Sequence, residues 1–387
     1  MIRTSTFIKI IVMIMVCAVG ATAATKNHYV LTNDDLSSAF PNSATFYTVG
    51  ARGALTQTAT VATNGNGIGG GFFGMKRIVV FSSDKTDCAY ASNAQSGDIV
   101  GIPIQTLKAN RPTRGSKNDG GTSNGIGLAM NAKYLYASFT DSSTIGTFQV
   151  KPGCKIVFVS DINVGGLQGG VIDGMAVHGN LLVATYGDGS IESFDVSAGV
   201  PVSNGDEQNS TGSRGGNAYP NGIDITQDGH YAIFGDTATS TIVEVSDISS
   251  GKLTPTVVYH LGNGISSSNI LLSPDETLLY ISNTQGYNIT AAFFDKSTGQ
   301  LSKGCVSSNL KGFVTDWTYL GALALENTTG TGGVVYAAEF GAPSSIAEIQ
   351  VTSAGGKCTL KESSKSPVTD PDSPGLLSIG AFPPRRF

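Results

Sequence analysis

The sequence predicts an all-β fold, a β-propeller with seven four-stranded blades. The chain has 387 residues, of which 50 are glycine and only 14% are charged, a composition typical of β-rich proteins with many tight turns. A short motif, in which a polar residue precedes glycine and an alternating apolar strand, recurs about every 48 residues, the length of one blade. No stretch longer than about one turn has helical periodicity.

The clearest repeat is a hairpin over residues 269–283, where the turn Ser273-Pro274-Asp275 joins two apolar strands. A third strand follows at Ile289–Phe294. Five further hairpins match this template. They are Ile78–Ser82 with Cys88–Ser92, Ile126–Met130 with Tyr134–Phe139, Met175–Val177 with Leu181–Tyr186, Ile223–Thr226 with Tyr231–Gly235, and Ala322–Leu325 with Val334–Ala338.

The two ends of the chain each supply part of a seventh unit. Three strands are expected at His28–Thr32, Thr45–Val49 and Thr56–Ala62, without an innermost partner. One strand is expected at Gly375–Phe382, without the other three. We expect these fragments to combine into a blade that closes the ring and leaves no open sheet edge. Six blades, or a packed β-sandwich, are the alternatives.

The N-terminus has the pattern of a signal peptide at residues 1–23, which leaves a single propeller domain at residues 24–387. Lys9 precedes the apolar run Ile10–Val19, and Ala21-Thr22-Ala23 resembles a cleavage site. A membrane anchor is the alternative, but the apolar run is short for a span. The resulting expectation is a secreted protein, or one from another oxidising compartment.

Four cysteines follow the predicted cleavage site, and an even number suits disulfides in such a compartment. We place Cys154, Cys305 and Cys358 at the start of outermost strands and Cys88 at the start of a second strand, all on the bottom face. Adjacency then pairs Cys88 with Cys154 and Cys305 with Cys358. Sequons at Asn209, Asn288 and Asn327 predict N-glycosylation if the source is a eukaryote.

The charge pattern excludes some classes of partner. The net charge is −5 and the sequence has no basic cluster, which argues against nucleic acid and against an anionic membrane after signal cleavage. The four histidines fall in bottom turns or outer positions, so a catalytic triad on the top face is not expected. A small-molecule substrate is the expected partner, and the sequence does not determine the oligomeric state.

Polar residues at the start of innermost strands form the candidate site. Asn124, Asp173 and Asn221 are expected to ring the top of the central channel, with Ser268 and Leu320 at the equivalent positions of the next two blades. A second tier, at the ends of the second strands, includes Asp34, Asp141, Asp188, Asp236 and Glu339. Such oxygen donors suit one divalent cation, with Ca²⁺ the most compatible. The alternative is that Asn-Gly and Asp-Gly only form tight turns.

These motifs resemble a known family. Ser123-Asn124-Gly125-Ile126, followed about 49 residues later by Asp173-Gly174-Met175, is similar to the regucalcin/gluconolactonase family of metal-dependent lactonases. Pro220-Asn221-Gly222-Ile223 resembles that family's Pro-Asn-Gly motif. The resemblance implies that Asn124 and Asp173 hold the metal. The family also uses an N-terminal glutamate ligand and six blades, whereas this chain has no glutamate before Glu192.

Aromatic residues gather in long connections that lead into the innermost strands, expected at Gly65–Lys76, Ala109–Ser123, Val202–Pro220 and Ser307–Leu320. We expect some of them to line a ligand mouth for an apolar organic substrate, although packing against the blades is the alternative. The candidates in these connections are Phe72, Phe73, Tyr219, Trp317 and Tyr319, and Tyr287 is a further candidate in a loop between a second and a third strand.

Three functions fit the sequence. The first is a lactonase in which a metal held by Asn124, Asp173 and Asn221 polarises the lactone carbonyl, with a second-tier aspartate, Asp141 or Asp236, as base. The second is a metal-independent cyclase or a pericyclase of Diels-Alderase type, which needs shape and stacking more than a metal. The third is a binding propeller without catalysis.

Overall fold

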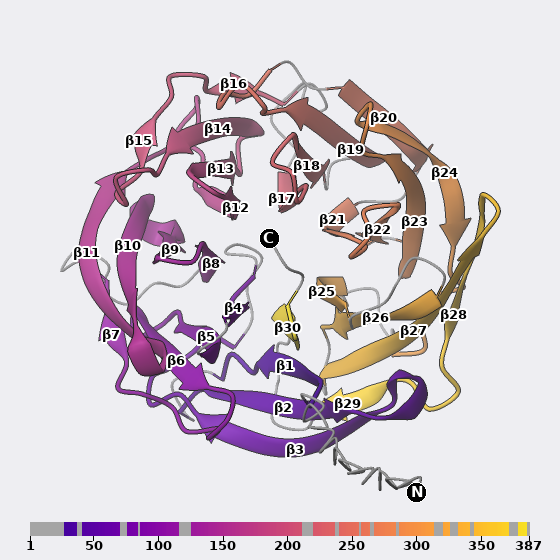
Figure 1. The fold of residues 1–387 in the computed structure, drawn as a ribbon, viewed down its shortest axis with the longest axis horizontal. Coiled ribbons are helices and arrows are strands. Elements are labelled where there is room, and N and C mark those ends of the chain that lie inside the picture. Colours follow the sequence, from indigo (N-terminus) through magenta and orange to yellow (C-terminus); the bar gives the residue numbers. More distant parts are fainter. Residues whose placement is uncertain are drawn as a thin grey trace, which may run out of the picture.

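The computed structural model arranges seven antiparallel β-sheets as blades around a central axis (Figure 1). The structure describes residues 27–36, 41–69, 76–83, 86–115, 125–210, 220–236, 240–254, 257–263, 267–283, 286–312, 320–325, 332–340, 344–370 and 378–384. The predicted signal peptide and Asn327 lie outside these ranges. The described residues contain three 3₁₀ turns but no α-helix, and hence none that could cross a membrane.

Blades 1 to 4 follow one another in the chain, each running from its innermost to its outermost strand. Blade 1 contains β4 (Ile78–Ser82), β5 (Asp87–Asn93), β6 (Asp98–Pro103) and β7 (Thr113–Arg114). Blade 2 contains β8 (Ile126–Met130), β9 (Tyr134–Phe139), β10 (Thr144–Lys151) and β11 (Lys155–Asn163), with the turns η2 (Thr140–Ser142) and η3 (Pro152–Cys154). Blade 3 contains β12 (Ile172–His178), β13 (Leu181–Tyr186), β14 (Ser190–Asp195), β15 (Val202–Ser203) and β16 (Gln208–Asn209). Blade 4 contains β17 (Pro220–Ile225), β18 (Tyr231–Asp236), β19 (Ser240–Asp247) and β20 (Val257–Asn263).

Blades 5 and 6 continue the series, and blade 7 joins the two ends of the chain. Blade 5 contains β21 (Ser267–Leu272), β22 (Leu278–Asn283), β23 (Asn288–Asp295) and β24 (Gln300–Val306). Blade 6 contains β25 (Leu320–Leu325), β26 (Gly332–Glu339), β27 (Ser344–Ala354), β28 (Lys357–Glu362) and β29 (Val368–Asp370). Blade 7 contains β30 (Ser378–Phe382), β1 (Tyr29–Asn33), β2 (Ser43–Val49) and β3 (Leu55–Ala62), with the turn η1 (Ala51–Gly53).

The predicted closure is confirmed, because β30 is the innermost strand of blade 7 and pairs with β1. Their antiparallel register runs from Tyr29 opposite Phe382 to Asn33 opposite Ser378. Two predicted loops are wrong in part. The range 109–123 contains the outer strand β7. The range 202–220 contains β15 and β16, which pair with opposite ends of β14. These outer strands are only two residues long, too short for an alternating pattern to reveal them.

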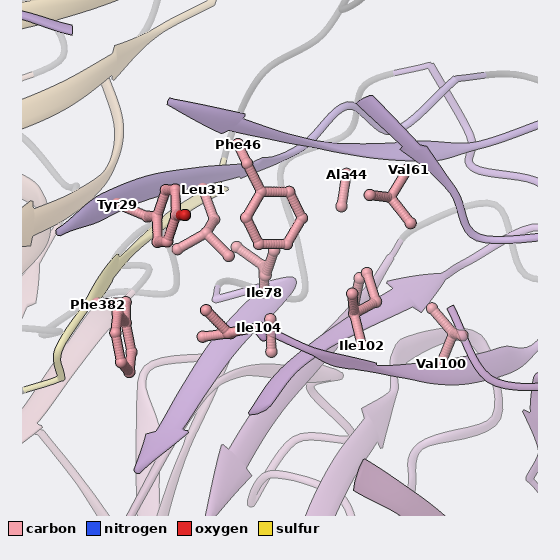
Figure 2. Packing of buried hydrophobic residues seen from close by; sticks show 12 residues of the cluster. Tyr29, Leu31, Ala44, Phe46, Val61, Ile78, Val100, Ile102, Ile104 and Phe382 are labelled. Atoms are coloured by element: carbon pink, nitrogen blue, oxygen red, sulfur yellow. The ribbon is translucent and has the colours of Figure 1, made fainter. Parts of the chain in front are cut away.

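Each interface between neighbouring blades holds one hydrophobic cluster, and seven clusters fill the seven interfaces. Alternate side chains of a strand point to opposite faces of its blade. Leu31 therefore packs against blade 1, while its neighbour Val30 packs against blade 6. Figure 2 shows the interface of blades 7 and 1, where Phe46 and Leu31 lie over Ile78 and Ile102. Both faces of every blade are thus buried.

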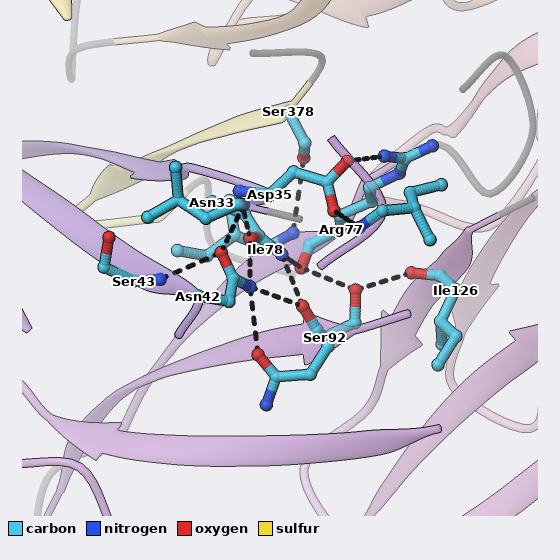
Figure 3. A network of polar contacts seen from close by, with 12 residues as sticks. Asn33, Asp35, Asn42, Ser43, Arg77, Ile78, Ser92, Ile126 and Ser378 are labelled. Atoms are coloured by element: carbon cyan, nitrogen blue, oxygen red, sulfur yellow. Dashed lines mark hydrogen bonds and ion pairs between the residues drawn. The ribbon is translucent and has the colours of Figure 1, made fainter. Parts of the chain in front are cut away.

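A polar network joins blades 7, 1 and 2 above this cluster (Figure 3). The Asn33 amide donates to the carbonyl oxygens of Arg77, at 3.0 Å, and of Ser92, at 2.8 Å. The Ser92 hydroxyl donates onward to the Ile126 carbonyl at 2.8 Å. Arg77 and Asp35 form a fully buried ion pair in the same network. Asn33 therefore adds hydrogen bonds that join β1 of blade 7 to the backbone of blade 1.

The innermost strands approach one another closely near the axis. A Cβ placed on Gly222 of β17 would lie 2.6 Å from the Cα of Asn269 on β21, so only glycine fits there. This contact gives the Asn221-Gly222 motif a packing function that its sequence, read as a turn, does not reveal.

Two disulfides clip neighbouring blades together, with the expected pairs. Cys88 of blade 1 bonds to Cys154 of blade 2, and Cys305 of blade 5 bonds to Cys358 of blade 6. The predicted position of Cys305 is wrong, because β24 begins at Gln300 and Cys305 lies near its end. The outermost strands β24 and β28 lie side by side at the rim, which brings the end of one to the beginning of the other (Figure 1).

Two buried carboxyl groups meet where blade 6 adjoins blade 7. Asp34 follows β1 and accepts hydrogen bonds from the hydroxyls of Thr32, at 2.5 Å, Ser43, at 2.5 Å, and Thr45, at 2.8 Å. The Thr32 hydroxyl also lies 3.3 Å from a carboxyl oxygen of Asp370, at the end of β29. Burial, and then the Asp370 charge, raise the pKa of Asp34 to about 7 despite these hydrogen bonds.

The raised pKa of Asp34 predicts a pH-dependent stability. Its ordinary pKa is 3.8, so the folded protein holds this proton more tightly than the unfolded chain. The associated stability is fully present below pH ~4 and is lost as the pH rises to about 7, a change on the order of 4 kcal/mol. Asp34→Asn should flatten this part of a stability curve measured by denaturant titration.

The control for that measurement is Asp195→Asn. Hydrogen bonds from Ser197 lower the pKa of the exposed Asp195, so its contribution has the opposite sign and is lost as the pH falls. A curve for Asp34→Asn that parallels the wild-type curve between pH 4 and 7 would contradict the assignment.

The close approach of β17 and β21 predicts the effect of filling Gly222. Gly222→Ala should lower the free energy of unfolding by about 1–3 kcal/mol, because the methyl group meets backbone atoms of Asn269 and Ile270 that cannot move aside easily. Gly165→Ala is the matched control, since a Cβ there has no neighbour within 4 Å. Denaturant titration of both variants checks the prediction, and equal stabilities would refute it.

Candidate functional site

The innermost strands of four consecutive blades begin with the same irregularity. In β12, Ile172 pairs with Tyr186 and Gly174 with Thr185, so Asp173 is an extra residue in the register of this strand. Strand β17 repeats this pattern, with Asn221 between the paired residues Pro220 and Gly222. Strands β21 and β25 also carry one extra residue near their start. Each is a β-bulge, a device that redirects side chains and often lies beside active sites.

The bulges define the channel mouth, by which we mean the first residues of β12, β17, β21 and β25 on the top face. Register places Asp173, Asn221, Ser268 and Gly321 at equivalent positions. The predicted equivalence of Asp173 and Asn221 is confirmed. The prediction that Leu320 is equivalent to Asp173 is wrong by one residue. Leu320 pairs with Glu339 as Ile172 pairs with Tyr186, so Leu320 is equivalent to Ile172.

The inner strands of blades 7, 1 and 2 have a regular register in the residues described, without the extra residue found in β12. In blade 2, Gly127 pairs with Ser138 as Gly174 pairs with Thr185 in blade 3. Asp173 is therefore one residue before its register glycine, whereas Asn124 is three residues before Gly127. The register thus makes Gly127, and not Gly125 of the Asn124-Gly125 motif, the equivalent of Gly174. Asn124 itself lies outside the described residues.

Hydroxyl groups of the second strands hold the inner-strand backbone at this level. The hydroxyl of Thr185 accepts a hydrogen bond from the Gly174 amide at 3.0 Å, and Ser282 does the same for Asn269 at 3.0 Å. Ser138 and Gly127 repeat the contact in blade 2 at 3.1 Å. The mouth thus rests on strands whose backbone positions are fixed by side chains, as a precise site requires.

Asp173 is fully buried, and burial raises its pKa well above the ordinary value. Within the described part of the chain, no three His, Cys, Asp or Glu side chains come together as a metal cluster. Of the three expected metal ligands, Asp173 is the one whose side chain the structure describes. Asn124 and the side chain of Asn221 lie outside the described part of the chain. These residues do not by themselves fit a calcium cage, which needs several oxygen ligands.

Two residues from other blades lie next to β17. The Lys76 ammonium, from the residue that leads into blade 1, donates to the Ile223 carbonyl of blade 4 at 2.6 Å and so crosses the central channel. Asn269 lies on the other side, with its Cα against Gly222, the neighbour of Ile223. The Asn269 side chain is buried, and its amide nitrogen has no hydrogen-bond partner among the residues that the structure describes. A buried donor without a partner is costly unless a ligand accepts from it.

The second tier is occupied mainly by structural contacts. The Asn283 amide donates to Asn288 at 2.7 Å and to Thr290 at 2.8 Å, within its own blade. Asp236 is buried at the end of β18, where its backbone carbonyl accepts from the Ser267 hydroxyl at 2.7 Å. Asp141 and Asp188 were expected at strand ends, but β9 ends at Phe139 and β13 at Tyr186. Asp141 is exposed in the turn η2, two residues beyond its strand.

Asp188 has a structural role that the sequence did not reveal. One carboxyl oxygen accepts from the amides of Gln168, at 2.8 Å, and Gly170, at 3.0 Å, in the connection from β11 to β12. The other accepts from Ser190. Burial raises the pKa of Asp188, but these hydrogen bonds outweigh it and lower the pKa on balance. Asp188 thereby fixes the segment that immediately precedes Asp173 and the channel mouth.

Glu339, by contrast, has the electrostatics of a functional acid. Burial raises its pKa to about 7; a hydrogen bond from Ser345 lowers the pKa, and the nearby Glu362 charge raises it. No described residue forms a hydrogen bond with the Oε1 atom of Glu339. The sequence around Glu339 places it in the second tier but carries no signal of its burial or of the neighbouring Glu362.

The predicted aromatic rim falls largely outside the described residues, which excludes Phe72, Phe73, Tyr219, Trp317 and Tyr319. Tyr287 is described and partly buried, in the loop between β22 and β23, and its carbonyl accepts from the Leu310 amide at 2.9 Å. Its backbone has a left-handed conformation with φ of 51°. Its role in substrate binding stays a prediction.

Solved structures share this fold at low sequence identity. The periplasmic gluconolactonase PpgL of Pseudomonas aeruginosa has 12% identity and a TM-score of 0.65, over 92% of this chain and 99% of that one. A functionally unknown protein of Desulfotomaculum acetoxidans has 14% identity and a TM-score of 0.60, over the same shares, 92% and 99%. A candidate 6-phosphogluconolactonase of Bacteroides uniformis has 13% identity and a TM-score of 0.54, over 71% and 80%.

At these identities the structural likeness establishes the fold alone. No curated protein sequence matches the chain. The sequence does match the family described as lactonase, seven-bladed β-propeller, over residues 89–371, which is well over half of the chain. The narrower resemblance to regucalcin is not confirmed by this match. The chain belongs to the lactonase family of seven-bladed β-propellers.

Proposed function

We propose that the protein hydrolyses the lactone ring of an apolar organic substrate at the channel mouth. The observation that carries the proposal is the row of four bulges, which places Asp173, Ser268 and two equivalent residues at one end of the channel in a chain of the lactonase family. Lactone hydrolysis needs a base that activates water and donors that stabilise the oxyanion. Asp173, Asn269 and Lys76 supply these groups around β17.

Asp173 is the proposed base. It removes a proton from water as the water oxygen attacks the lactone carbonyl, and the resulting carboxylic acid returns the proton to the ring oxygen when the C–O bond breaks. Water and lactone thus give a hydroxy acid. The raised pKa of Asp173 makes its carboxylate a stronger base than an exposed aspartate. Because the carboxyl is covered in the structure, the substrate must displace the groups that cover it.

Asn269 and Lys76 are the proposed oxyanion donors. The Asn269 amide nitrogen has no hydrogen-bond partner within the described part of the chain, so it gives up no contact to those residues when the carbonyl oxygen of a substrate arrives. The Lys76 ammonium adds a positive charge on the opposite side of β17. Donors fixed before the reaction are worth more in a buried site than in water.

We also propose that the protein acts outside the cytoplasm. Two disulfides in one chain are typical of oxidising compartments, and the N-terminal signal pattern agrees with this. If the source is a eukaryote, Asn209 is the favoured glycosylation site of the two described. Its side chain is exposed, whereas Asn288 is half-buried and its amide donates to the Gly286 carbonyl at 2.8 Å.

The base is tested with Asp173→Asn. The variant should hydrolyse an aliphatic δ-lactone such as δ-decalactone about 10²- to 10⁴-fold more slowly than wild type. In the wild type, kcat/KM should rise with pH through the raised pKa of Asp173, far above the usual range of aspartate, and the variant should lose this dependence. Parallel assays of Asp141→Asn and Asp236→Asn locate the base, and full activity of Asp173→Asn would refute the proposal.

The same assay decides whether a metal takes part. Metal analysis of the purified protein, followed by dialysis against a chelator, tests the expectation of one bound divalent cation. Tightly bound calcium, with activity lost on chelation, would assign Asp173 to the metal and exclude it as the free base. Unchanged activity supports the mechanism above.

The oxyanion donors are tested with Asn269→Ala. Removing one donor should lower kcat by about 10²- to 10³-fold with little change in KM, because the contact strengthens in the transition state. Asn180→Ala is the matched control, in an exposed turn on the opposite face. An effect on KM alone would place Asn269 in substrate binding and not in oxyanion stabilisation.

A further inference from the structure

A second pocket lies at the outer rim between blades 1 and 2, away from the channel mouth. Its volume is about 270 Å³. One wall comes from β6 and the segment that precedes β7, including Asn110, Arg111 and Pro112. The other wall comes from the end of β10, the turn η3 and the start of β11, including Lys151, Lys155 and Val157.

The walls of this rim pocket are held rigidly. The Asn110 amide donates to the Gly153 carbonyl at 2.8 Å, and the Thr113 hydroxyl donates to the Ile156 carbonyl at 3.2 Å, so both contacts cross between blades. The disulfide from Cys154 to Cys88 fixes the turn η3 to blade 1. A pocket that exists before the ligand arrives loses little entropy on binding.

Charge distinguishes the rim pocket from the rest of the molecule. The protein has a net charge of −5, yet three cationic side chains, Arg111, Lys151 and Lys155, line this one pocket. No acidic residue occurs among its described lining residues. None of the three cations forms an ion pair with a described carboxylate, and the Lys151 ammonium donates only to the neutral Gln149 at 2.6 Å. A cleft with one sign of charge concentrates ligands of the other sign.

The floor of the pocket is apolar, which narrows the class of ligand. Pro112, Ile156 and Val157 contribute carbon surface, and Val157 is half exposed although it is a large aliphatic residue. We propose that the rim pocket binds a small organic carboxylate, with its apolar body on this floor and its carboxylate between Arg111 and Lys155. The guanidinium of Arg111 matches the two oxygens of a carboxylate. This site does not depend on the proposed lactonase activity.

The test is a calorimetric titration of the full chain with three probes. Hexanoate has both the charge and the apolar body, acetate has only the charge, and hexanol has only the body. We expect hexanoate to bind saturably at one site, and acetate and hexanol to bind at least about tenfold more weakly. Added salt should weaken hexanoate binding, because the cations are partly exposed to solvent. Hexanoate that does not saturate in the millimolar range would overturn the proposal.

The double variant Arg111→Gln/Lys155→Gln locates the site. It should weaken hexanoate binding about tenfold and leave hexanol binding unchanged. Both residues are exposed, so the fold should persist, and an unchanged unfolding temperature checks this. Lys296→Gln, in an exposed turn of blade 5, is the control for overall charge and should bind hexanoate like the wild type. Equal binding of hexanoate to the double variant, as expected if it binds at the channel mouth, would overturn the proposal.

Discussion

The pairing of β1 with β30 is the constraint on which the rest of the structure depends. It places the last strand of the chain at the centre of a blade whose other three strands come first. With the ring closed, no blade has an outward face, so neighbouring residues such as Val30 and Leu31 must both be apolar and serve different interfaces. Sheets buried on both faces have nearly continuous apolar strands for the same reason. Closure also explains why polar strand ends need partners in the next blade, as Asn33 finds in the carbonyl oxygens of Arg77 and Ser92.

The seam at this closure concentrates buried charge. Arg77 and Asp35 form an ion pair there, and Asp34 meets Asp370 within a cluster of hydroxyl groups. Breaking a buried ion pair by removing one partner typically costs about 3–5 kcal/mol, because the remaining charge is left without compensation. These groups therefore specify one arrangement of blades 6, 7 and 1. Hydrophobic packing alone tolerates small shifts, whereas a buried hydrogen-bonded network does not.

The sequence was sufficient to predict the ring but not the register of the site. Hairpins such as residues 269–283 carry their own turn and their own apolar alternation, and repetition multiplies that signal. A bulge, however, adds a residue without changing the local pattern, so Asn124-Gly125 and Asp173-Gly174 look alike although Gly127 and Gly174 share the register position. Burial has no local signal either. The pKa of Glu339 is raised by burial first and then by the charge of Glu362, which is distant in sequence. Asp188 accepts hydrogen bonds from a loop that precedes its own blade.

In a ring of radial blades, the strands lie closer together at the centre than at the rim, so the two regions suit different kinds of site. Near the axis the inner strands lie so close together that only glycine fits at Gly222. A bulge in such closely packed strands holds its polar groups in fixed positions. Blades diverge with distance from the axis, so crevices open at the rim, and the rim pocket between blades 1 and 2 is one of them. Both disulfides join neighbouring blades, and the one from Cys305 to Cys358 joins two outermost strands. The disulfide from Cys88 to Cys154 therefore has two structural effects. It joins two diverging blades, and it fixes one wall of a pocket whose charge is opposite to that of the whole protein.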